Sequence, residues 1–468
     1  MVTKSTEQEK HHEQDVVPGP AEEQSLANSL VKTTLHAMRN EDVEALYEIV
    51  QETHEADLAD MVALLSADAR QEFLSLVGNH LNSEVLAELD EGIRAEVASA
   101  LDTDKLVAVV QELDTDDAVF VLGELDDAGQ QEILDQIPET DRLVLQRSLD
   151  YPEESAGRLM RSDVVAFPPF WTVGKAIDYL RETEDLPDDF YEILVIDPSF
   201  SPIGVVQLNK AMRSARPVKL TDIMDEHLTL IPADMDREDM ARRFERYNLV
   251  SAPVIDADGR LVGVVTADDV FEVIVDEAEE DILLLGGVGD EAVTDSVIEA
   301  ARGRFNWLFV NLLTAILASM VIAFFEASLE QMVALAVLMP IVASMGGNAG
   351  TQTLTITVRA LATMDLMSVN AMRVISREFW IALINGGVFA ILMGAIGAFW
   401  FDNTMLGAVL AMAMIVNMLV AGLSGILIPI GLNKAGIDPA LASSVFVTTI
   451  TDVFGFMAFL GFASWILL

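Results

Sequence analysis

The sequence predicts a multidomain membrane protein. Four parts are expected: an all-α helical-repeat N domain, a tandem pair of α/β domains, an acidic connecting helix and a transmembrane domain of five α-helices. Acid is concentrated before about residue 300 and apolar residues after it, in a 468-residue chain of formal net charge -47 and 51% hydrophobic residues. Such asymmetry is typical of an acidic soluble part joined to a membrane part. Two internal repeats divide the acidic part.

Residues 1–23 are polar, lack the apolar run of a signal peptide and predict a disordered tail. Residues 24–150 are expected to form the N domain, where an apolar residue recurs every twelve positions and an Asp directly follows most of them. An Asp that caps one short amphipathic helix explains each unit. Most of these acids are therefore expected to be caps rather than metal ligands. The recurring apolar residues are Leu89, Leu101, Leu113, Leu125, Ile137 and Leu149.

The second repeat consists of "ILVIDPSFSPIGVV" at 193–206 and "APVIDADGRLVGVV" at 252–265. Each copy predicts a strand, a turn, a second strand and a helix, and an element containing Met160 or Met224 precedes each. Residues 151–275 are therefore expected to form two domains, about 157–216 and 220–275. They resemble a tandem pair of cystathionine-β-synthase (CBS) domains, which commonly act as intracellular ligand sensors.

Residues 276–304 are expected to form the acidic connecting helix, with a helical run from about Asp295 into the first span. Like charges at this density destabilise a helix unless cations screen them. This segment could link a cytosolic sensor to the membrane part. The acids of this segment are Asp276, Glu277, Glu279, Glu280 and Asp281, and Glu272 at the end of the preceding domain lies close to them in the sequence.

Residues 305–468 contain five apolar stretches, each long enough to cross a bilayer of about 30 Å. They are 307–325, 332–357, 379–401, 406–432 and 441–468. Every Lys or Arg between or just before them lies on the N-terminal side of the membrane, which the positive-inside rule places in the cytoplasm. The acidic half is then cytosolic, and the C-terminus lies outside. These basic residues are Arg302, Arg304, Arg359, Arg373, Arg377 and Lys434.

Asp452, in "SSVFVTTITDVFGFMAF", is the acid that lies well inside the fifth stretch. An intramembrane carboxylate is costly and marks an ion path by default. The alternative is an Asp that pairs with a neighbouring helix, but the chain offers no basic residue at matching depth. Asp452 is therefore expected to be functional.

The second stretch contains "PIVASMGGNAGTQTLTITVRALA" at 340–362. One interpretation is irregular backbone that lines a pore with carbonyl, amide and hydroxyl oxygens. The other, equally compatible with the spacing, is a set of small residues for close helix packing. Hard oxygen groups with one carboxylate suit Mg²⁺ or Ca²⁺. The candidate pore residues are Gly346, Gly347, Gly350, Asn348, Thr351 and Gln352.

Composition limits the function further. The chain has no cysteine, so disulfides and thiolate metal sites are excluded. Its net charge disfavours nucleic acid and suits cations. A salt-adapted surface explains the bulk acidity equally well, so only acids at special positions indicate a function.

Together these features resemble the MgtE family of magnesium channels over nearly the whole chain. The most specific motif is P-x-x-x-x-x-G-G-N-x-G-x-Q, which begins at Pro340 and is followed by R-A-L-A. "GIDPALASS" and "TTITD" near the C-terminus also fit. The resemblance implies a homodimer in the lipid bilayer, with a pore at the dimer axis and Asp452 as its acid.

The resemblance also implies regulatory Mg²⁺ sites in the cytosolic part and on the last hairpin. Asn248 stands where a carboxylate would be the stronger ligand, and Thr351 and Ser444 stand where amides can occur. The implied ligands are Glu84, Asp116, Asp236, Glu245, Asn248, Asp269, Glu272, Glu277, Glu280, Asp281 and Asp438.

The expected function is a Mg²⁺-selective channel of the cytoplasmic membrane that cytosolic Mg²⁺ closes. It is not expected to be an enzyme, because no nucleophile and base occur together. One rival is a coupled divalent-cation exchanger, although no intramembrane His or Glu relay is visible. Another rival is a non-transporting membrane protein whose CBS pair reads a nucleotide. The sequence leaves open whether ATP binds the CBS pair.

Overall fold

The computed structural model describes residues 20–183, 186–187, 190–288, 297–363, 366, 371–441 and 444–467. It contains two compact units, Met1–Ile274 and Val275–Leu468, and each is described by itself. Most of the predicted tail and Asp295 lie outside the described residues. Helix α1 already begins at Pro20, so the predicted tail boundary at residue 23 is slightly late.

The N domain is built of short helices that begin at regular intervals. Asp90, Asp102, Asp114 and Asp126 occupy the N-cap positions of four successive helices, which confirms the predicted repeat. Of these four side chains, only that of Asp126 accepts a backbone N–H of its helix, from Gly129 at 2.8 Å, so the predicted capping hydrogen bond is present in one unit and not in the other three. The helices are α1 (Pro20–Arg39), α2 (Val43–Glu52), α3 (Glu55–Leu64), α4 (Ala67–Val77), α5 (Glu84–Ala87), α6 (Glu91–Ala100), α7 (Thr103–Glu112), α8 (Thr115–Gly123), α9 (Asp127–Leu134) and α10 (Glu139–Leu149).

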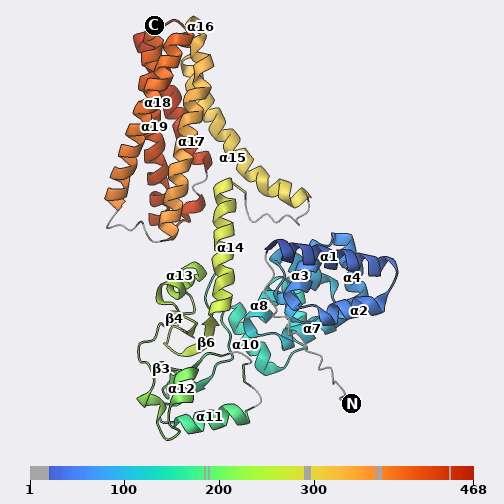
Figure 1. Cartoon of the computed structure of the whole chain (residues 1–468). Coiled ribbons are helices and arrows are strands. Elements are labelled where there is room, and N and C mark those ends of the chain that lie inside the picture. The colour runs from blue at the N-terminus through green and yellow to red at the C-terminus, as the bar shows by residue number, and fades with distance from the viewer. Residues whose placement is uncertain are drawn as a thin grey trace, which may run out of the picture. The chain divides into compact units, whose positions relative to one another are not determined.

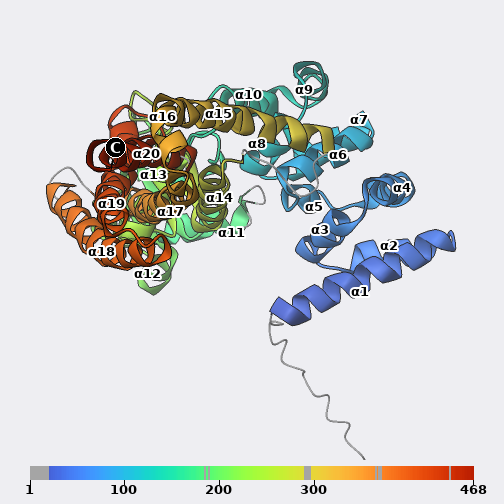
Figure 2. The ribbon, with the colours of Figure 1, turned by 90° about the horizontal axis from the view of Figure 1, so that it is seen from above.

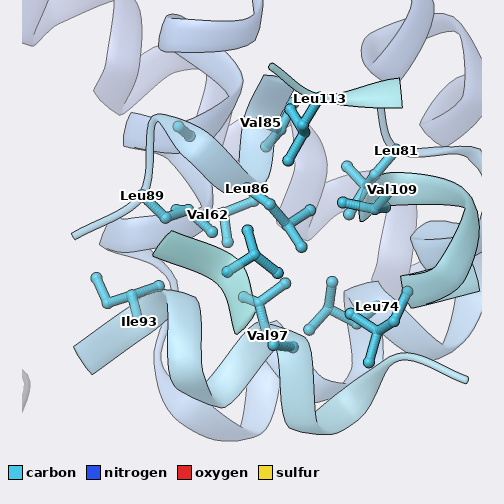
Figure 3. Packing of buried hydrophobic residues seen from close by; sticks show 14 of the residues in the cluster. Val62, Leu74, Leu81, Val85, Leu86, Leu89, Ile93, Val97, Val109 and Leu113 are labelled. Carbon is cyan, nitrogen blue, oxygen red and sulfur yellow. The ribbon is translucent and has the colours of Figure 1, made fainter. Parts of the chain in front are cut away.

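The core of the N domain forms because helices two positions apart along the chain pack together, as α2 and α4 or α4 and α6 do. Figure 2 shows this succession of short helices. Val62, Leu74, Leu86 and Val97 come from four consecutive helices and meet in one apolar cluster (Figure 3). Stacked repeats that share one core in this way make a superhelix.

The CBS pair contains two three-stranded sheets with the same topology. The first is β1 (Ala166–Phe167), β2 (Glu192–Ile196) and β3 (Pro202–Gln207), and the second is β4 (Ile231–Pro232), β5 (Ser251–Ile255) and β6 (Leu261–Thr266). In each sheet the first pairing is parallel and the second antiparallel, with a register shift at the same place. Helices α11 (Val173–Glu182) and α12 (Leu208–Arg213) belong to the first copy, and α13 (Arg237–Tyr247) and α14 (Ala267–Gly286) to the second. The predicted repeat is confirmed.

The segment that precedes each copy packs against the sheet of the other copy. Met160 precedes the first copy, yet its side chain fills the space beside Gly263 in the second sheet. Met224 precedes the second copy and lies against Gly204 in the first. The backbone of Arg161 likewise bridges to β6. The predicted boundaries of 157–216 and 220–275 therefore do not separate the two packing units.

Among the residues that the structure describes, the second unit contains five helices that are long and apolar enough to cross a membrane, which confirms the five predicted spans. Figure 1 shows these five helices. The connecting helix differs from the expectation, because α14 begins inside the second CBS copy and ends at Gly286. The five are α15 (Val297–Phe324), α17 (Ala334–Ala362), α18 (Ala371–Trp400), α19 (Thr404–Lys434) and α20 (Ser444–Ile466), with the short α16 (Glu326–Gln331) between the first two.

The glycine-rich segment is helical throughout, so the expectation of irregular backbone is wrong. Close packing explains its glycines. A Cβ on Gly350 would lie 2.4 Å from Val447 Cγ1 of α20, and a Cβ on Gly425 of α19 would lie 2.7 Å from the Gly350 carbonyl oxygen. Small residues let three helix backbones approach here, which is the packing alternative raised by the sequence.

We expect Gly350→Val to destabilise the membrane part by about 1–3 kcal/mol, because the added carbons overlap α20. Gly387→Val is the matched control, since a Cβ on Gly387 of α18 meets nothing within 4 Å. Thermal unfolding of the purified protein in detergent measures both. Equal midpoints for the two variants would contradict the close contact at Gly350.

Candidate functional site

Asp452 lies half-buried on α20, one turn beyond Thr448. This part of α20 packs against α17, where a Cβ on Gly347 would lie 3.2 Å from Thr448 Cγ2. The Thr448 hydroxyl donates to the Val445 carbonyl at 3.1 Å, which leaves its own oxygen able to accept. The structure therefore places the predicted pore acid on a helix that contacts the glycine segment.

The exposed face of α17 is polar in the same region. Ser344, Asn348 and Gln352 are exposed and follow one another at four-residue intervals, so they share one helix face. Asn348 Nδ2 donates to Ser344 Oγ at 3.4 Å, and Thr351 beside this face is partly exposed. The amide and hydroxyl groups predicted for a pore thus form a stripe that this chain alone does not cover.

Asn417 is a buried polar residue that the sequence analysis missed. It is fully buried on α19 and donates through Nδ2 to the Val342 carbonyl at 2.6 Å. Its amide fills the space beside Gly346 and Gly455, so it joins α17, α19 and α20. The sequence does contain a signal for this buried residue, because Asn417 is the one Asn in the apolar run "AMIVNMLV".

Glu378 is a second missed group, and it bears on the expectation that no intramembrane His or Glu relay is visible. The sequence placed the third span from residue 379, whereas α18 begins at Ala371. Glu378 is only 6% exposed, and Thr353 Oγ1 of α17 donates to its Oε2 at 3.5 Å. The bundle therefore encloses one more carboxylate than expected.

In the first unit, Arg161 gathers four carboxylates. Its Nη1 lies 2.9 Å from Asp114 and its Nε 3.1 Å from Asp116, both on or beside α8. Its Nη2 lies 3.3 Å from Asp268 and 3.4 Å from Asp269, both in the first turn of α14. The structure thus brings the predicted ligands Asp116 and Asp269 together, but around an arginine that the sequence analysis did not single out.

Burial controls the electrostatics of this cluster. Asp116 is 2% exposed, its Oδ1 has no hydrogen-bond partner, and burial raises its pKa well above the usual range. Burial, opposed by Arg161 and reinforced by Asp269, raises the pKa of Asp117 to about 7. Burial also raises the pKa of Asp269, although the Thr266 hydroxyl donates to it at 2.6 Å.

A second acidic group lies in the other unit, where α14 meets the membrane helices. Leu284 of α14 packs with Leu354, Val358 and Val447 of α17 and α20. Nearby, burial, reinforced by the charges of Asp438 and Glu277, raises the pKa of Asp281 to about 6. Asp281 is therefore close enough to two other predicted regulatory acids, Asp438 and Glu277, to be repelled by both.

The remaining predicted ligands are dispersed within the chain. Asp236 caps α13, accepting from Glu238 N at 3.0 Å, while exposed Glu245 lies in the last turn and Asn248 ends the helix with φ 50°. The length of α13, about 16 Å, separates Asp236 from the other two. Asp236 and Asn248 have structural explanations as the caps of α13, and the three positions do not form one site within a single chain.

Three further acids complete the predicted set. Glu84 opens α5, and burial followed by the charge of Asp114 raises its pKa. Glu272 is exposed and Glu280 is half-buried on α14. Over the described residues, no three His, Asp or Glu side chains are arranged to hold a metal ion. Carboxylate oxygens nevertheless suit Mg²⁺, which keeps several of its waters.

The fold and these groups define a multi-pass membrane protein equipped for hard cations. The MgtE family, described as divalent cation transporters, matches residues 339–462, its intracellular N domain matches 53–154 and the CBS family matches 220–276. The magnesium transporter MgtE of Bacillus subtilis is 32% identical over 332 residues, 71% of this chain and 74% of that protein. The Thermus thermophilus transporter of the same name is 33% identical over 340 residues, again 71% and 74%.

A solved structure described as the cytosolic domain of the Mg²⁺ channel MgtE in complex with ATP covers 52% of this chain and 99% of its own, with 29% identity and a TM-score of 0.48. The two sequence relatives decide the assignment. The chain belongs to the MgtE family of magnesium transporters.

We expect Asp117→Asn to stabilise the protein at high pH. The pKa of this carboxyl rises from 3.8 in a solvated state to about 7 when folded, so folding is penalised increasingly as pH rises through that window. The gain in thermal midpoint should be a few degrees at pH 8 and should fade towards pH 5. Asp104→Asn, at an exposed site on α7, is the control. A gain that is independent of pH would contradict the assigned burial.

Proposed function

We propose that this protein is a Mg²⁺-selective channel that mediates magnesium uptake across the cytoplasmic membrane and is closed by cytosolic Mg²⁺. The observation that carries the proposal is the half-buried Asp452 on α20, beside the glycine segment of α17. A carboxylate at membrane depth attracts a cation strongly.

The neutral ligands of the pore then come from side chains. Because α17 is a continuous helix, the carbonyls of Gly346 and Gly347 serve its own backbone. The polar stripe with Asn348, Thr351 and Gln352 is the better source of oxygens. Mg²⁺ sheds water reluctantly, so amides and hydroxyls would contact its hydration shell.

A homodimer accounts for the uncovered faces. A polar stripe on a spanning helix is costly in contact with lipid, and a second copy facing it would enclose water and ions. Phe271, Val275 and Ile282 also lie exposed along α14 despite its acidic surroundings. By the positive-inside rule, the N-terminus and the acidic domains would face the cytosol and the C-terminus would lie outside.

Gating would use the acids at the end of α14. Glu277 and Asp438 both repel Asp281 while α14 is docked, and Mg²⁺ bound among these acids would remove that penalty. Each such site stabilises the closed state by RT ln(1 + [Mg²⁺]/Kd). Several weak sites, including those implied at Asp236, Glu245, Asn248, Glu272 and Glu280, would make closure steep.

Glu378 supports a second candidate function. A buried carboxylate between α17 and α18 could carry a proton, as a coupled cation exchanger requires. Currents that ignore the proton gradient would favour the channel, whereas Mg²⁺ movement that follows the gradient would favour the exchanger.

The CBS pair offers a cavity for a nucleotide such as ATP. Phe190 and Tyr191 line it, together with Pro253 of the second copy. Glu192, also in the lining, accepts from the Ser251 hydroxyl at 3.1 Å. Aromatic rings beside a fixed carboxylate suit a purine and its ribose hydroxyls. Direct titration of the purified protein with ATP tests this role.

We expect Asp452→Asn to reduce Mg²⁺ current about tenfold or more, because the amide keeps the shape but loses the charge that draws the ion to this depth. Single-channel recording in reconstituted bilayers measures it. Asp402→Asn, in the loop between α18 and α19, is the matched control. Parental current through a folded Asp452→Asn protein would refute the pore assignment.

We expect the double variant Asp281→Asn/Asp438→Asn to lose much of its dependence on cytosolic Mg²⁺. The substitution removes ligands and repulsion together, so the diagnostic result is a flattened response rather than a particular resting state. Patch recording over a range of cytosolic Mg²⁺ measures it, with Glu279→Gln, exposed on the same helix, as the control. An unchanged Mg²⁺ midpoint in the double variant would remove these acids from the gate.

A further inference from the structure

Arg161 is held rigidly where the N domain meets the second CBS copy. Its backbone N–H donates to the Val264 carbonyl at 2.8 Å, and its carbonyl accepts from Val264 N at 2.9 Å. The residue therefore lies on the edge of β6 as a short extra strand segment. This anchoring directs its side chain toward the contact between α8 and the first turn of α14.

Every nitrogen of the guanidinium is engaged at this contact. Nη1 and Nε contact Asp114 and Asp116 from the N domain, and Nη2 contacts Asp268 and Asp269 from the CBS pair. The planar fork of arginine can bridge several carboxylates at once, which the point charge of lysine cannot. One side chain thus joins two domains through two acids on each side.

The same acids would repel one another without a cation between them. Asp116 is almost fully buried and keeps one oxygen without a hydrogen-bond partner, so it has no solvent to offset its charge. Asp116 and Asp269 are also positions where the family resemblance implies bound Mg²⁺. In this chain the guanidinium occupies the space between them.

We propose that Arg161 is a built-in counter-ion that holds the N domain against the CBS pair, so that this junction stays closed when Mg²⁺ is withdrawn. A covalently attached cation cannot be diluted away, whereas a bound ion dissociates when its concentration falls. Mg²⁺ sensing would then be concentrated at the other acids, such as Asp281 and Asp438. The statement about the junction stands without any transport activity, and its consequence for gating rests on the proposed function.

The chain offers a direct reporter for this junction. It has no cysteine, and Thr115 Oγ1 of α8 lies 2.6 Å from Ser162 Oγ, next to Arg161. The variant Thr115→Cys/Ser162→Cys should form a disulfide while the junction is closed. Thiol labelling of the full-length protein in detergent, under mild oxidant and with EDTA or millimolar Mg²⁺, measures the rate of cross-linking.

We expect the reporter protein to cross-link at the same rate in EDTA and in Mg²⁺. Adding Arg161→Met should slow cross-linking about tenfold or more in EDTA, because buried charged hydrogen bonds are lost. Mg²⁺ should restore much of that rate by replacing the missing charge. Arg147→Met is the matched control, since Arg147 crosses the same boundary with one partner, Asp256, at 3.6 Å.

Two outcomes would overturn the proposal. The first is slower cross-linking of the Arg161-containing reporter in EDTA, which would make the junction itself Mg²⁺-dependent. The second is an Arg161→Met reporter that behaves like the control in EDTA. If Arg161→Met does not fold, Arg161→Lys replaces it and should show a smaller slowing, while the first comparison is unaffected. If the reporter protein cross-links as expected but the parental protein carries no Mg²⁺-dependent current, the proposed function alone fails and the statement about the junction stands.

Discussion

Carboxylates that lie close together repel one another unless a positive charge lies between them. This constraint applies at the two places in this protein where acids from different segments are brought together. A chain with a formal net charge of -47 meets it in two different ways. Between α8 and α14 the protein supplies its own cation, Arg161. Between the end of α14 and Asp438 the described side chains leave a repulsion that a solution cation could relieve. The same protein can therefore contain one contact that its own arginine stabilises at any Mg²⁺ concentration and one that depends on a cation from solution.

Local periodicity explains why much of the fold could be predicted. The five spans, the capped twelve-residue helices and the doubled sheet each depend on residues near one another in the sequence. The exchange of Met160 and Met224 could not be predicted, because both copies have the same pattern and only long-range packing decides which sheet each methionine joins. The site shows the same division. Asp452, Asp116 and Asp269 were predicted as functional acids from the sequence, but Arg161, which contacts Asp116 and Asp269, was not predicted as a partner.

The glycine segment shows where a pattern has two physical solutions. Gly346 and Gly350 would suit either an open backbone or close helix contact, and the sequence offers no way to choose. The choice depends on the neighbours: Asn417 and Val447 fill the space that side chains would have taken. Asn417 was missed because an isolated polar residue in an apolar run shows its burial only when the surrounding helices are in place. Glu378 was missed because it follows Arg377 just before the predicted third span, whereas α18 already begins at Ala371.

The exchange of Met160 and Met224 also has a consequence for how the protein folds and evolves. Neither α/β copy completes its own sheet, so a chain emerging from the ribosome cannot finish the first copy until the segment around Met224, which precedes the second copy, has been made. The pair is then one cooperative unit despite its internal duplication. A deletion or transplant that respects the apparent repeat boundary would cut through both cores, whereas one that takes residues 156–274 together would keep them whole.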